Sequence, residues 1–458
     1  MPRFLRSLAQ VKGAEVTNIA IVGAGHVGVV YAAGLAELGH QVKVIDINDK
    51  RIAMLRAGRI WFYEPGLPEL LGRGLSRKRI TFTTSYPLGL ARARFVFVCV
   101  PTPTTAEGSL DDSYLRSAFS NIRQYTKLPR PIIVNKSTVP VGTGDVAARL
   151  FEDDDIHVVS NPEFLAEGRA VEDFFHPSRI VIGSRNRIAG EAVAALYAPL
   201  RAPVVHTDPV TAEFSKLSAN AFLATKVSFA NVLSRIGESV GADGDGLAKA
   251  LSLDPRIGAG HLRAGLGFGG SCLPKDLAAI EQLARRFTDA PGFFAAVAAV
   301  NRAQRSRVVD LLVERFGAVA ERRIAVLGAT FKANTDDLRD SPALYLARQL
   351  AELHAEVVVY DPVAGPQLKT VAPELQIARS ALAAARGADA VIVATEWPEL
   401  ATLDLVSVRR AMRGTLLIDG RGLYDAESAH RAGLDYFSFS TAGVRPRPAE
   451  DLLPAVAS

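Results

Sequence analysis

Cysteine is scarce in this chain. Only Cys99 and Cys272 occur among 458 residues, which excludes a disulfide framework and leads us to expect a reducing compartment, the cytoplasm. The eight histidines never stand at metal-ligand spacing from one another, and no cluster of cysteine and histidine occurs. We therefore expect no metal site, which argues against a zinc-dependent alcohol dehydrogenase.

Long apolar runs and runs of like charge are also missing. The longest apolar stretch, around residues 292–300, is far shorter than the ~20 residues that span a bilayer, and residues 1–16 lack the apolar core of a signal peptide. The net charge of +5 is spread along the sequence, without the basic stripe that is typical of nucleic-acid binding. We expect a short leader (1–16), a tail (446–458), and neither a membrane nor a nucleic-acid partner.

Hydrophobic residues make up 48% and charged residues 22% of the chain, which is the balance of a folded globular protein. At about 150 residues per domain, the length predicts roughly three structural units.

The first unit begins with an apolar run that closes on three glycines, and a stretch of helical composition follows. Further strand-like runs alternate with helical stretches, which predicts a parallel sheet wrapped by helices over residues 17–205. The expected strands are 41–47, 95–100, 132–135, 156–160 and 180–183.

Apolar residues then recur at helical spacing over 207–240, which predicts one long helix that connects domains and offers a dimer surface. A glycine-rich loop at 254–275 has no periodicity, and loops of this kind are usually functional. Strands at 323–327, 356–360, 390–394 and 415–419 predict a second nucleotide-fold domain over 320–445. The predicted fold is α/β, with two doubly wound Rossmann-like domains joined by a central helical region at 206–319.

The glycines of the first domain carry a specific signal. Gly23, Gly25 and Gly28 form Gly-x-Gly-x-x-Gly between a strand and a helix, where backbone amides hold a pyrophosphate. Asp46 ends the next strand, where a carboxylate accepts hydrogen bonds from the adenosine ribose and repels a 2′-phosphate. This pattern predicts NAD rather than NADP; the alternative is a structural turn with a surface aspartate.

The two cysteines differ in setting. Cys99 lies in an apolar run and reads as a small hydrophobic residue of a buried strand. Cys272 lies in the glycine-rich loop, close to Lys275, which favours a thiolate, and to Asp276, which can accept a proton. On spacing alone, a nucleophile and an incidental cysteine remain equal interpretations of Cys272.

Two further pairs of residues can carry chemistry. Lys216 and Asn220 stand four residues apart on the predicted long helix and so share a face, where they can hold a sugar oxygen and an oxyanion. Glu163 and Glu167 follow a strand end, where a carboxylate can act as a base. The alternatives are a solvated helix edge and surface acids.

Eight ordered segments together resemble the nucleotide-sugar 6-dehydrogenases of the UDP-glucose/GDP-mannose dehydrogenase family, over residues 17–423. The segments are Gly23-Ala-Gly-His-Val-Gly, Glu64-Pro-Gly-Leu, Val100-Pro-Thr-Pro, Lys136-Ser-Thr-Val-Pro, Asn161-Pro-Glu-Phe-Leu-Ala-Glu-Gly, Lys216-Leu-Ser-Ala-Asn-Ala-Phe-Leu, Gly267-Phe-Gly-Gly-Ser-Cys-Leu-Pro-Lys-Asp, and Phe331-Lys with Asp337-Leu-Arg-Asp-Ser-Pro.

The resemblance implies an NAD-dependent four-electron oxidation of the C6 alcohol of a nucleoside-diphosphate glucose, UDP-glucose to UDP-glucuronate. It implies that Asp276 and Lys216 help remove the hydroxyl proton, and that Cys272 captures the aldehyde as a thiohemiacetal, which becomes a thioester. Lys216 and Asn220 would stabilise oxyanions, Glu163 would activate the hydrolytic water, and Thr138 would position a water.

The same resemblance implies the binding residues and a homodimer or higher homo-oligomer. The cofactor-binding residues it implies are Gly23, Gly25, His26, Val27, Gly28, Asp46, Thr102, Thr138, Glu167, Lys275 and Arg339. The substrate-binding residues it implies are Glu163, Phe164, Leu165, Lys216, Asn220, Arg256, His261, Leu262, Arg263, Gly269, Phe331, Lys332 and Arg421. Arg256 would reach the site of a partner subunit.

Two positions depart from the family pattern. His261 replaces the usual Phe or Tyr beside the base, and Arg263 replaces a common Lys. These departures make dTDP-glucose, and to a lesser degree GDP-mannose, alternative substrates. Two rival functions also remain: a silent NAD-binding scaffold, and a two-electron dehydrogenase that would not need Cys272.

Overall fold

The computed structural model describes residues 16–105, 107–126, 130–288 and 292–440. The expected leader and tail lie largely or wholly outside these ranges. The chain divides into two compact units, with the boundary between Ala219 and Asn220; we call them unit 1 and unit 2 and describe each by itself. The three-part division at 205 and 319 stays a prediction.

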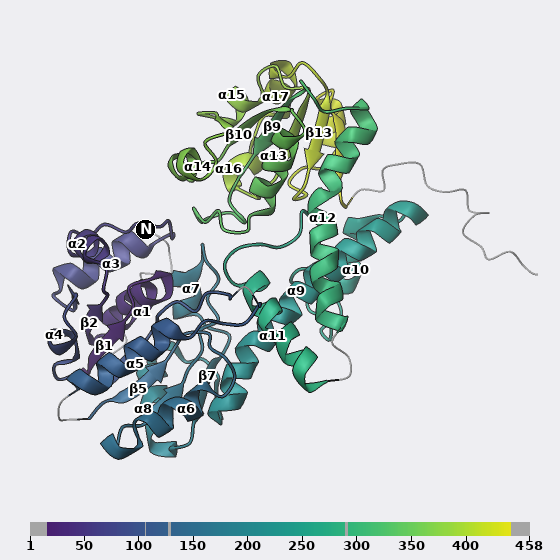
Figure 1. Ribbon diagram of the computed structural model, residues 1–458. Coiled ribbons are helices and arrows are strands. Elements are labelled where there is room, and N and C mark those ends of the chain that lie inside the picture. The colour runs from purple at the N-terminus through teal and green to yellow at the C-terminus, as the bar shows by residue number, and fades with distance from the viewer. Residues whose placement is uncertain (1–15, 106, 127–129, 289–291, 441–458) are drawn as a thin grey trace, which may run out of the picture. The chain divides into compact units, whose positions relative to one another are not determined.

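Unit 1, coloured purple to teal in Figure 1, contains an eight-stranded sheet in the order β3-β2-β1-β4-β5-β6-β7-β8. The strands are β1 (Asn18–Val22), β2 (Gln41–Ile45), β3 (Ile80–Thr83), β4 (Phe95–Val98), β5 (Ile132–Asn135), β6 (Val158–Ser160), β7 (Ile180–Ser184) and β8 (Val204–Thr207). The helices are α1 (His26–Glu37), α2 (Asp49–Arg56), α3 (Leu67–Ser76), α4 (Tyr86–Leu90), α5 (Ser113–Tyr125), α6 (Thr143–Leu150), α7 (Ala170–Phe175) and α8 (Arg187–Leu196), with 3₁₀ turns η2 (Glu152–Asp154) and η3 (Ala198–Leu200).

The alternation of side chains along β1 explains why helices cover both faces of this sheet. Ile19 and Ile21 point into a core built with α1, α3, α7 and α8. Ala20 and Val22 point into a second core with α4, α5 and α6. Since both faces are buried, the strand is a continuous apolar run, as is typical of parallel sheets.

One pairing of this sheet corrects the sequence-based prediction. The pattern of strands and helices predicts parallel neighbours throughout, but β6 and β7 pair antiparallel. The sequence also gives no signal for β3 and β8, which are short edge strands; β8 is largely exposed and carries no buried apolar face.

Unit 2 contains a six-stranded parallel sheet in the order β11-β10-β9-β12-β13-β14. The strands are β9 (Arg323–Leu327), β10 (Glu356–Tyr360), β11 (Gln376–Ile377), β12 (Ala390–Val393), β13 (Leu416–Asp419) and β14 (Asp435–Ser438). The helices are α10 (Gly244–Ser252), α11 (Leu273–Phe287), α12 (Gly292–Phe316), α13 (Pro342–Glu352), α14 (Gly365–Val371), α15 (Ala381–Ala385), α16 (Pro398–Ala401), α17 (Leu405–Ala411) and α18 (Ala426–Arg431).

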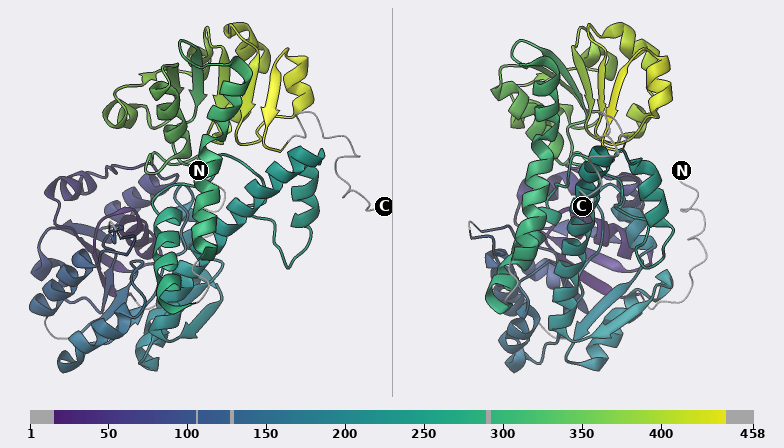
Figure 2. Two further views of the ribbon diagram at one scale, coloured as in Figure 1. Left: turned by 45° about the vertical axis from the view of Figure 1, so that its right-hand side comes forward. Right: turned by 90° about the vertical axis from the view of Figure 1, so that its right-hand side faces the viewer.

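The second sheet, like the first, is covered by helices on both faces. Ile324 and Val326 of β9 pack with α12 and α13, and Ala325 and Leu327 pack with α15, α17 and α18 on the other face. Both views of Figure 2 show α12 as one unbroken helix that reaches this sheet.

The boundary between the units falls within α9 (Pro209–Val240), the predicted long helix. Pro209 is the first residue of α9, where its missing N–H costs no helical hydrogen bond. The two doubly wound sheets and this helix confirm the predicted fold class. Within the described ranges, no helix has both the length and the apolar character needed to cross a membrane.

Candidate active site

The glycine-rich turn between β1 and α1 contains glycines of two kinds. Gly23 has φ +101°, and a Cβ there would lie 2.5 Å from the carbonyl oxygen of Cys99; a Cβ on Gly28 would lie 2.0 Å from that of Gly23. Gly25 has an ordinary φ of −73°, and no atom lies within 4 Å of an added Cβ. The fold thus requires Gly23 and Gly28, whereas Gly25 leaves open space at the N-terminus of α1, as an approaching phosphate needs.

The Asp46 carboxylate binds a backbone N–H of this turn. Its carboxylate accepts hydrogen bonds from Ala24 N at 2.7 Å and Asn48 N at 2.9 Å, and the residue is nearly buried at the end of β2. The open amide turn and the fixed carboxylate fit the pyrophosphate and ribose of a dinucleotide. Val27 is half-buried in the first turn of α1.

Glu64 connects the glycine turn to a second loop. Its buried carboxylate accepts hydrogen bonds from Gly168 N and Ala170 N, both at 2.7 Å, and lies 2.8 Å from His26 Nε2. The His26 ring also packs on Phe62 at 4.7 Å. Glu64 therefore fixes His26 and the loop at 161–168, which carries Glu167; the sequence pattern gave it no such role.

Thr102 and Thr138 come together beyond the ends of β4 and β5. Thr102 Oγ1 donates a hydrogen bond to the Thr138 carbonyl oxygen at 2.6 Å. The two threonines follow adjacent strands of the sheet, so the topology brings two of the predicted cofactor-binding positions to one edge.

Glu163 and Lys216 form a buried ion pair in unit 1. Lys216 Nζ lies 3.0 Å from Glu163 Oε1, and Glu163 Oε2 accepts a hydrogen bond from Leu165 N at 2.6 Å. Burial alone would raise the pKa of Glu163, but Lys216, the Leu165 N–H and Lys136 outweigh it, so the pKa lies below its ordinary value. Glu163 is therefore a carboxylate at neutral pH, the state that a general base requires.

The Phe164 ring lies beside this pair. Lys216 Nζ is 5.5 Å from the ring centroid, and the Arg179 guanidinium stacks over the same ring at 3.7 Å. The loop that carries Glu163, Phe164 and Leu165 is thus clamped by cations.

The second cluster lies in unit 2, where Asp276 is buried between two donors. Asn220 Nδ2 donates to Asp276 Oδ2 at 2.5 Å, and Lys275 Nζ pairs with Asp276 Oδ1 at 2.6 Å. The structure thus brings Asn220, Lys275 and Asp276 together. Lys275 pairs with this carboxylate, whereas its sequence position alone suggested a role beside the thiol.

Cys272 caps the N-terminus of α11 and is partly exposed. Its Sγ lies 3.6 Å from Ser271 Oγ, and its carbonyl oxygen accepts a hydrogen bond from Asp276 N. The N-terminus of a 15-residue helix favours the thiolate form of a cysteine. Cys99 differs: it is buried below the glycine turn, and burial raises the pKa of its thiol to about 12.

The glycines before Cys272 pack against the chain near residue 340. A Cβ on Gly269 would lie 2.1 Å from Asp340 O, one on Gly270 would meet the Phe331 ring at 2.7 Å, and Gly270 N donates to Arg339 O at 3.1 Å. The structure thus brings the predicted positions Gly269, Phe331 and Arg339 to the loop of Cys272, and it is protein rather than ligand that requires these two glycines.

His261 adopts the left-handed backbone region, with φ +62°. Burial lowers the pKa of its imidazole, and Lys226 and Lys332 lower it further. These two lysines therefore face the predicted substrate residue His261. Lys226 was not predicted; its Nζ holds the glycine-rich loop by the carbonyl oxygens of Ile257 and Gly258, each at 3.1 Å.

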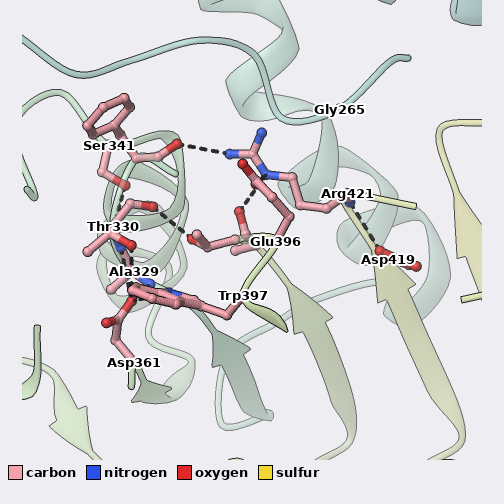
Figure 3. A network of polar contacts seen from close by, with 12 residues as sticks. Gly265, Ala329, Thr330, Ser341, Asp361, Glu396, Trp397, Asp419 and Arg421 are labelled. Atoms are coloured by element: carbon pink, nitrogen blue, oxygen red, sulfur yellow. Dashed lines mark hydrogen bonds and ion pairs between the residues drawn. The ribbon is translucent and has the colours of Figure 1, made fainter. Parts of the chain in front are cut away.

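Arg421 lies at the carboxyl end of β13 in a dense polar network (Figure 3). Its guanidinium donates to Ala394 O at 2.8 Å and to Phe331 O at 3.3 Å, and pairs with Glu396 at 3.2 Å. The structure therefore joins the predicted positions Phe331 and Arg421.

The other predicted substrate residues lie on the surface or in a separate pocket. Arg256 pairs with Asp254 and is well exposed, and Arg263 pairs with the exposed Asp245. Leu262 lines a small pocket that includes Leu233 and Leu251.

Comparison with known proteins covers nearly the whole chain. Residues 17–201 match the NAD binding domain of the UDP-glucose/GDP-mannose dehydrogenase family, residues 210–303 its central domain, and residues 325–426 its UDP binding domain. UDP-glucose 6-dehydrogenase YwqF of Bacillus subtilis is 39% identical over 94% of this chain and 99% of its own length. UDP-glucose 6-dehydrogenase AglM of Haloferax volcanii is 41% identical over 92% and 99%.

A solved UDP-glucose dehydrogenase from Pyrobaculum islandicum is 38% identical, covers 94% of this chain and 99% of its own, and has a TM-score of 0.86. These matches confirm the predicted NAD cofactor and the predicted class of enzyme, an NAD-dependent dehydrogenase of nucleotide sugars. The chain belongs to the UDP-glucose/GDP-mannose dehydrogenase family.

Proposed function

We propose that this enzyme oxidises the C6 alcohol of UDP-glucose to the carboxylate of UDP-glucuronate, in two oxidations that pass through a thioester on Cys272. The observation that carries the proposal is the position of Cys272 at the N-terminus of α11, four residues before the buried Asp276. A two-electron dehydrogenase has no use for a nucleophile there, and a silent scaffold has no use for the whole cluster.

NAD, when bound, would supply the hydride acceptor for both oxidations. The turn at Gly23, Gly25 and Gly28 would hold its pyrophosphate and Asp46 its ribose, with His26 and Val27 in the same turn. Thr102, Thr138, Glu167, Lys275 and Arg339 would complete its site.

In the first oxidation, the Asp276 carboxylate accepts the proton of the C6 hydroxyl through an ordered water, positioned by Thr138, and the Lys216 ammonium stabilises the negative charge that develops on the oxygen, while C6 loses a hydride. The carbon becomes an aldehyde. Asn220 keeps the Asp276 carboxylate oriented through its 2.5 Å hydrogen bond, and burial strengthens each of these electrostatic contacts.

In the second oxidation, the Cys272 thiolate adds to the aldehyde carbon, so that a carbon–sulfur bond forms and the carbonyl oxygen becomes an oxyanion. Lys216 and Asn220, one turn apart on α9, stabilise this charge. Loss of a second hydride from C6 restores the carbonyl as a thioester, and the aldehyde never leaves the enzyme.

Hydrolysis then releases the product. Glu163 takes a proton from a water, whose oxygen adds to the thioester carbon, and the carbon–sulfur bond breaks to return the Cys272 thiolate. The lowered pKa of Glu163 supports this role, because the carboxylate must be ionised to act as a base.

For the nucleotide sugar, we propose contacts from Phe164, Leu165 and Gly269 to the sugar, and from His261, Leu262, Arg263, Phe331, Lys332 and Arg421 to the nucleotide part. The lysines near His261 supply positive charge suited to a diphosphate.

We also propose a cytoplasmic homodimer. Phe222, Phe229 and Ile236 of α9 are exposed by more than half and recur every seven residues. This is the spacing of one helix face, and an exposed apolar stripe is a surface that a second copy can cover. Arg256 would contact the partner's site.

The test is a pair of cysteine variants. Cys272→Ala is expected to lower UDP-glucuronate formation at least about 1000-fold, because no thioester can form, while NAD affinity measured by titration stays unchanged. Cys99→Ala is the matched control and is expected to keep activity within about two-fold, since a buried thiol with a raised pKa takes no part in the chemistry. Undiminished acid formation by C272A would contradict the covalent mechanism.

A further inference from the structure

Lys136 is a buried cation that the proposed chemistry does not use. It directly follows β5 and is 1% exposed, and its neighbours include the rings of Tyr31 and Tyr197. A lysine is almost never buried this fully without a specific set of partners.

The two hydrogen-bond acceptors of Lys136 lie in one turn. Its Nζ donates to Asn161 Oδ1 at 3.1 Å and to Pro162 O at 3.3 Å, and it lies 4.2 Å from the centroid of the Tyr31 ring. These contacts occupy two donors of the ammonium group and place a ring face against it. The acceptors of the two hydrogen bonds, Asn161 and Pro162, immediately precede Glu163 in the chain.

Asn161 connects Lys136 to the sheet by hydrogen bonds. Its N–H donates to Asn135 O, its Nδ2 donates to Val181 O at 2.7 Å, and its Oδ1 also accepts from Tyr197 OH at 2.7 Å. The start of the turn is therefore fixed by two strands as well as by Lys136.

One side of the turn borders a cavity. Asn161, Pro162, Phe164 and Leu165 line a cavity of about 200 Å³, together with Lys136. On the side of the cavity, the turn is held by the polar contacts of Lys136.

We propose that Lys136 is a positioning residue: it holds the Asn161–Pro162 turn and adds positive charge behind it, so that Glu163 stays ionised and within reach of Lys216. The inference rests on the proposed function, in which Glu163 is the base for thioester hydrolysis. Lys136 acts through Glu163 and touches no reacting atom.

The charged surroundings support this assignment. Burial lowers the pKa of Lys136 to about 7, while Cys99 and Glu163 raise it and Lys216 lowers it. Tyr31 and Tyr197 stay neutral, because burial raises the pKa of each hydroxyl. Lys216 and Lys136 are the cations that lower the pKa of Glu163, so removing Lys136 raises that pKa.

The experiment compares the pH dependence of kcat for UDP-glucuronate formation in wild type, Lys136→Met and Tyr197→Phe. In K136M the acidic limb is expected to move up by about one pH unit, so that kcat is down roughly ten-fold on that limb. The deficit vanishes at higher pH, where Glu163 is ionised in both proteins, and KM for NAD stays unchanged. Y197F removes the other donor to Asn161 without a change of charge, so it is expected to lower Tm and leave the pH profile in place.

Lys136→Arg is a second test variant, and its result is informative even if K136M fails to fold. Arginine keeps the charge, so its acidic limb must coincide with that of wild type; an upward shift in K136R, or a K136M profile that superimposes on wild type, overturns the proposal. Wild type is assayed in the same series. If wild type forms no UDP-glucuronate, it is the proposed function that fails, and not the inference on Lys136 alone.

Discussion

The turn after β1 in unit 1 and the turn after β9 in unit 2 share one backbone design. Gly23 and Gly328 both have positive φ, +101° and +91°, and each donates its N–H to the last residue of the neighbouring strand, Ile45 or Tyr360. In each turn the next N–H donates to the aspartate that follows that strand, at 2.7 Å to Asp46 and 2.8 Å to Asp361.

The two turns differ in what fills the space in front of them. Two residues after Gly23 stands Gly25, with open space around it; two residues after Gly328 stands Thr330, which is completely buried. Thr330 O accepts a hydrogen bond from Thr395 Oγ1 at 2.7 Å, and Asp361 accepts further hydrogen bonds from Thr330 and from Trp397 Nε1 (Figure 3).

This comparison shows how one fold serves two purposes. The turn of unit 1 leaves open space at Gly25, whereas in the turn of unit 2 the corresponding residue, Thr330, is bonded to its neighbours and helps to hold the domain together. The match of residues 325–426 to a UDP binding domain agrees with a sheet that has lost the dinucleotide turn.

Replacement of Asp361 by alanine is expected to have the largest effect on stability. Asp361→Ala removes the acceptor for Ala329 N, Thr330 N, Val363 N, Ala364 N and Trp397 Nε1. Buried donors left without a partner cost about 3 kcal/mol or more in total, which corresponds to a fall in Tm of roughly 6–12 °C.

Asp46→Ala is the matched variant in unit 1, where the carboxylate accepts hydrogen bonds from two backbone donors, Ala24 N and Asn48 N. Its fall in Tm should be the smaller of the two, and its KM for NAD should rise. Thermal unfolding of both variants measures the difference; equal shifts in Tm would contradict the distinction between an open and a filled turn.

Gly25→Ala is expected to have a smaller effect on Tm. The added Cβ meets no protein atom and φ is ordinary, so Tm should stay within about 1 °C. The methyl group would occupy the space for the pyrophosphate, and KM for NAD should rise about ten-fold or more. Gly365→Ala is the control, because its Cβ also meets no atom within 4 Å but lies in unit 2. Unchanged NAD kinetics in G25A would place the cofactor elsewhere.

Much of the fold could be predicted because local signals coincide with it. The strands 132–135, 323–327 and 356–360 are observed with the predicted bounds, since apolar runs between turn residues mark buried parallel strands. β11 has two residues and β14 lies at the sheet edge, so neither carries a pattern long enough to detect. The antiparallel direction of β7 depends on its partner, which no local pattern records.

The candidate site could be predicted where its residues lie in one sequence motif. It could not be predicted where the interacting residues lie far apart in the sequence. Cys272, Asp276 and Lys275 stand within five residues of one another, so the sequence alone groups them. Glu64 contacts Gly168 and Ala170, more than 100 residues away. Glu213 likewise accepts from Gly142 N and Gly144 N across about 70 residues. Such contacts are set by topology, and a single sequence shows only the isolated charge.

The yield of NADH per nucleotide sugar tests the central claim most directly. Limiting UDP-glucose, dTDP-glucose and GDP-mannose would each be incubated with excess NAD and wild-type enzyme until the reaction stops, and initial rates recorded. The account predicts two NADH per UDP-glucose, no free aldehyde, and slow turnover of the other two sugars. One NADH per UDP-glucose with release of an aldehyde would contradict the thioester mechanism, and faster turnover of dTDP-glucose would contradict the proposed substrate.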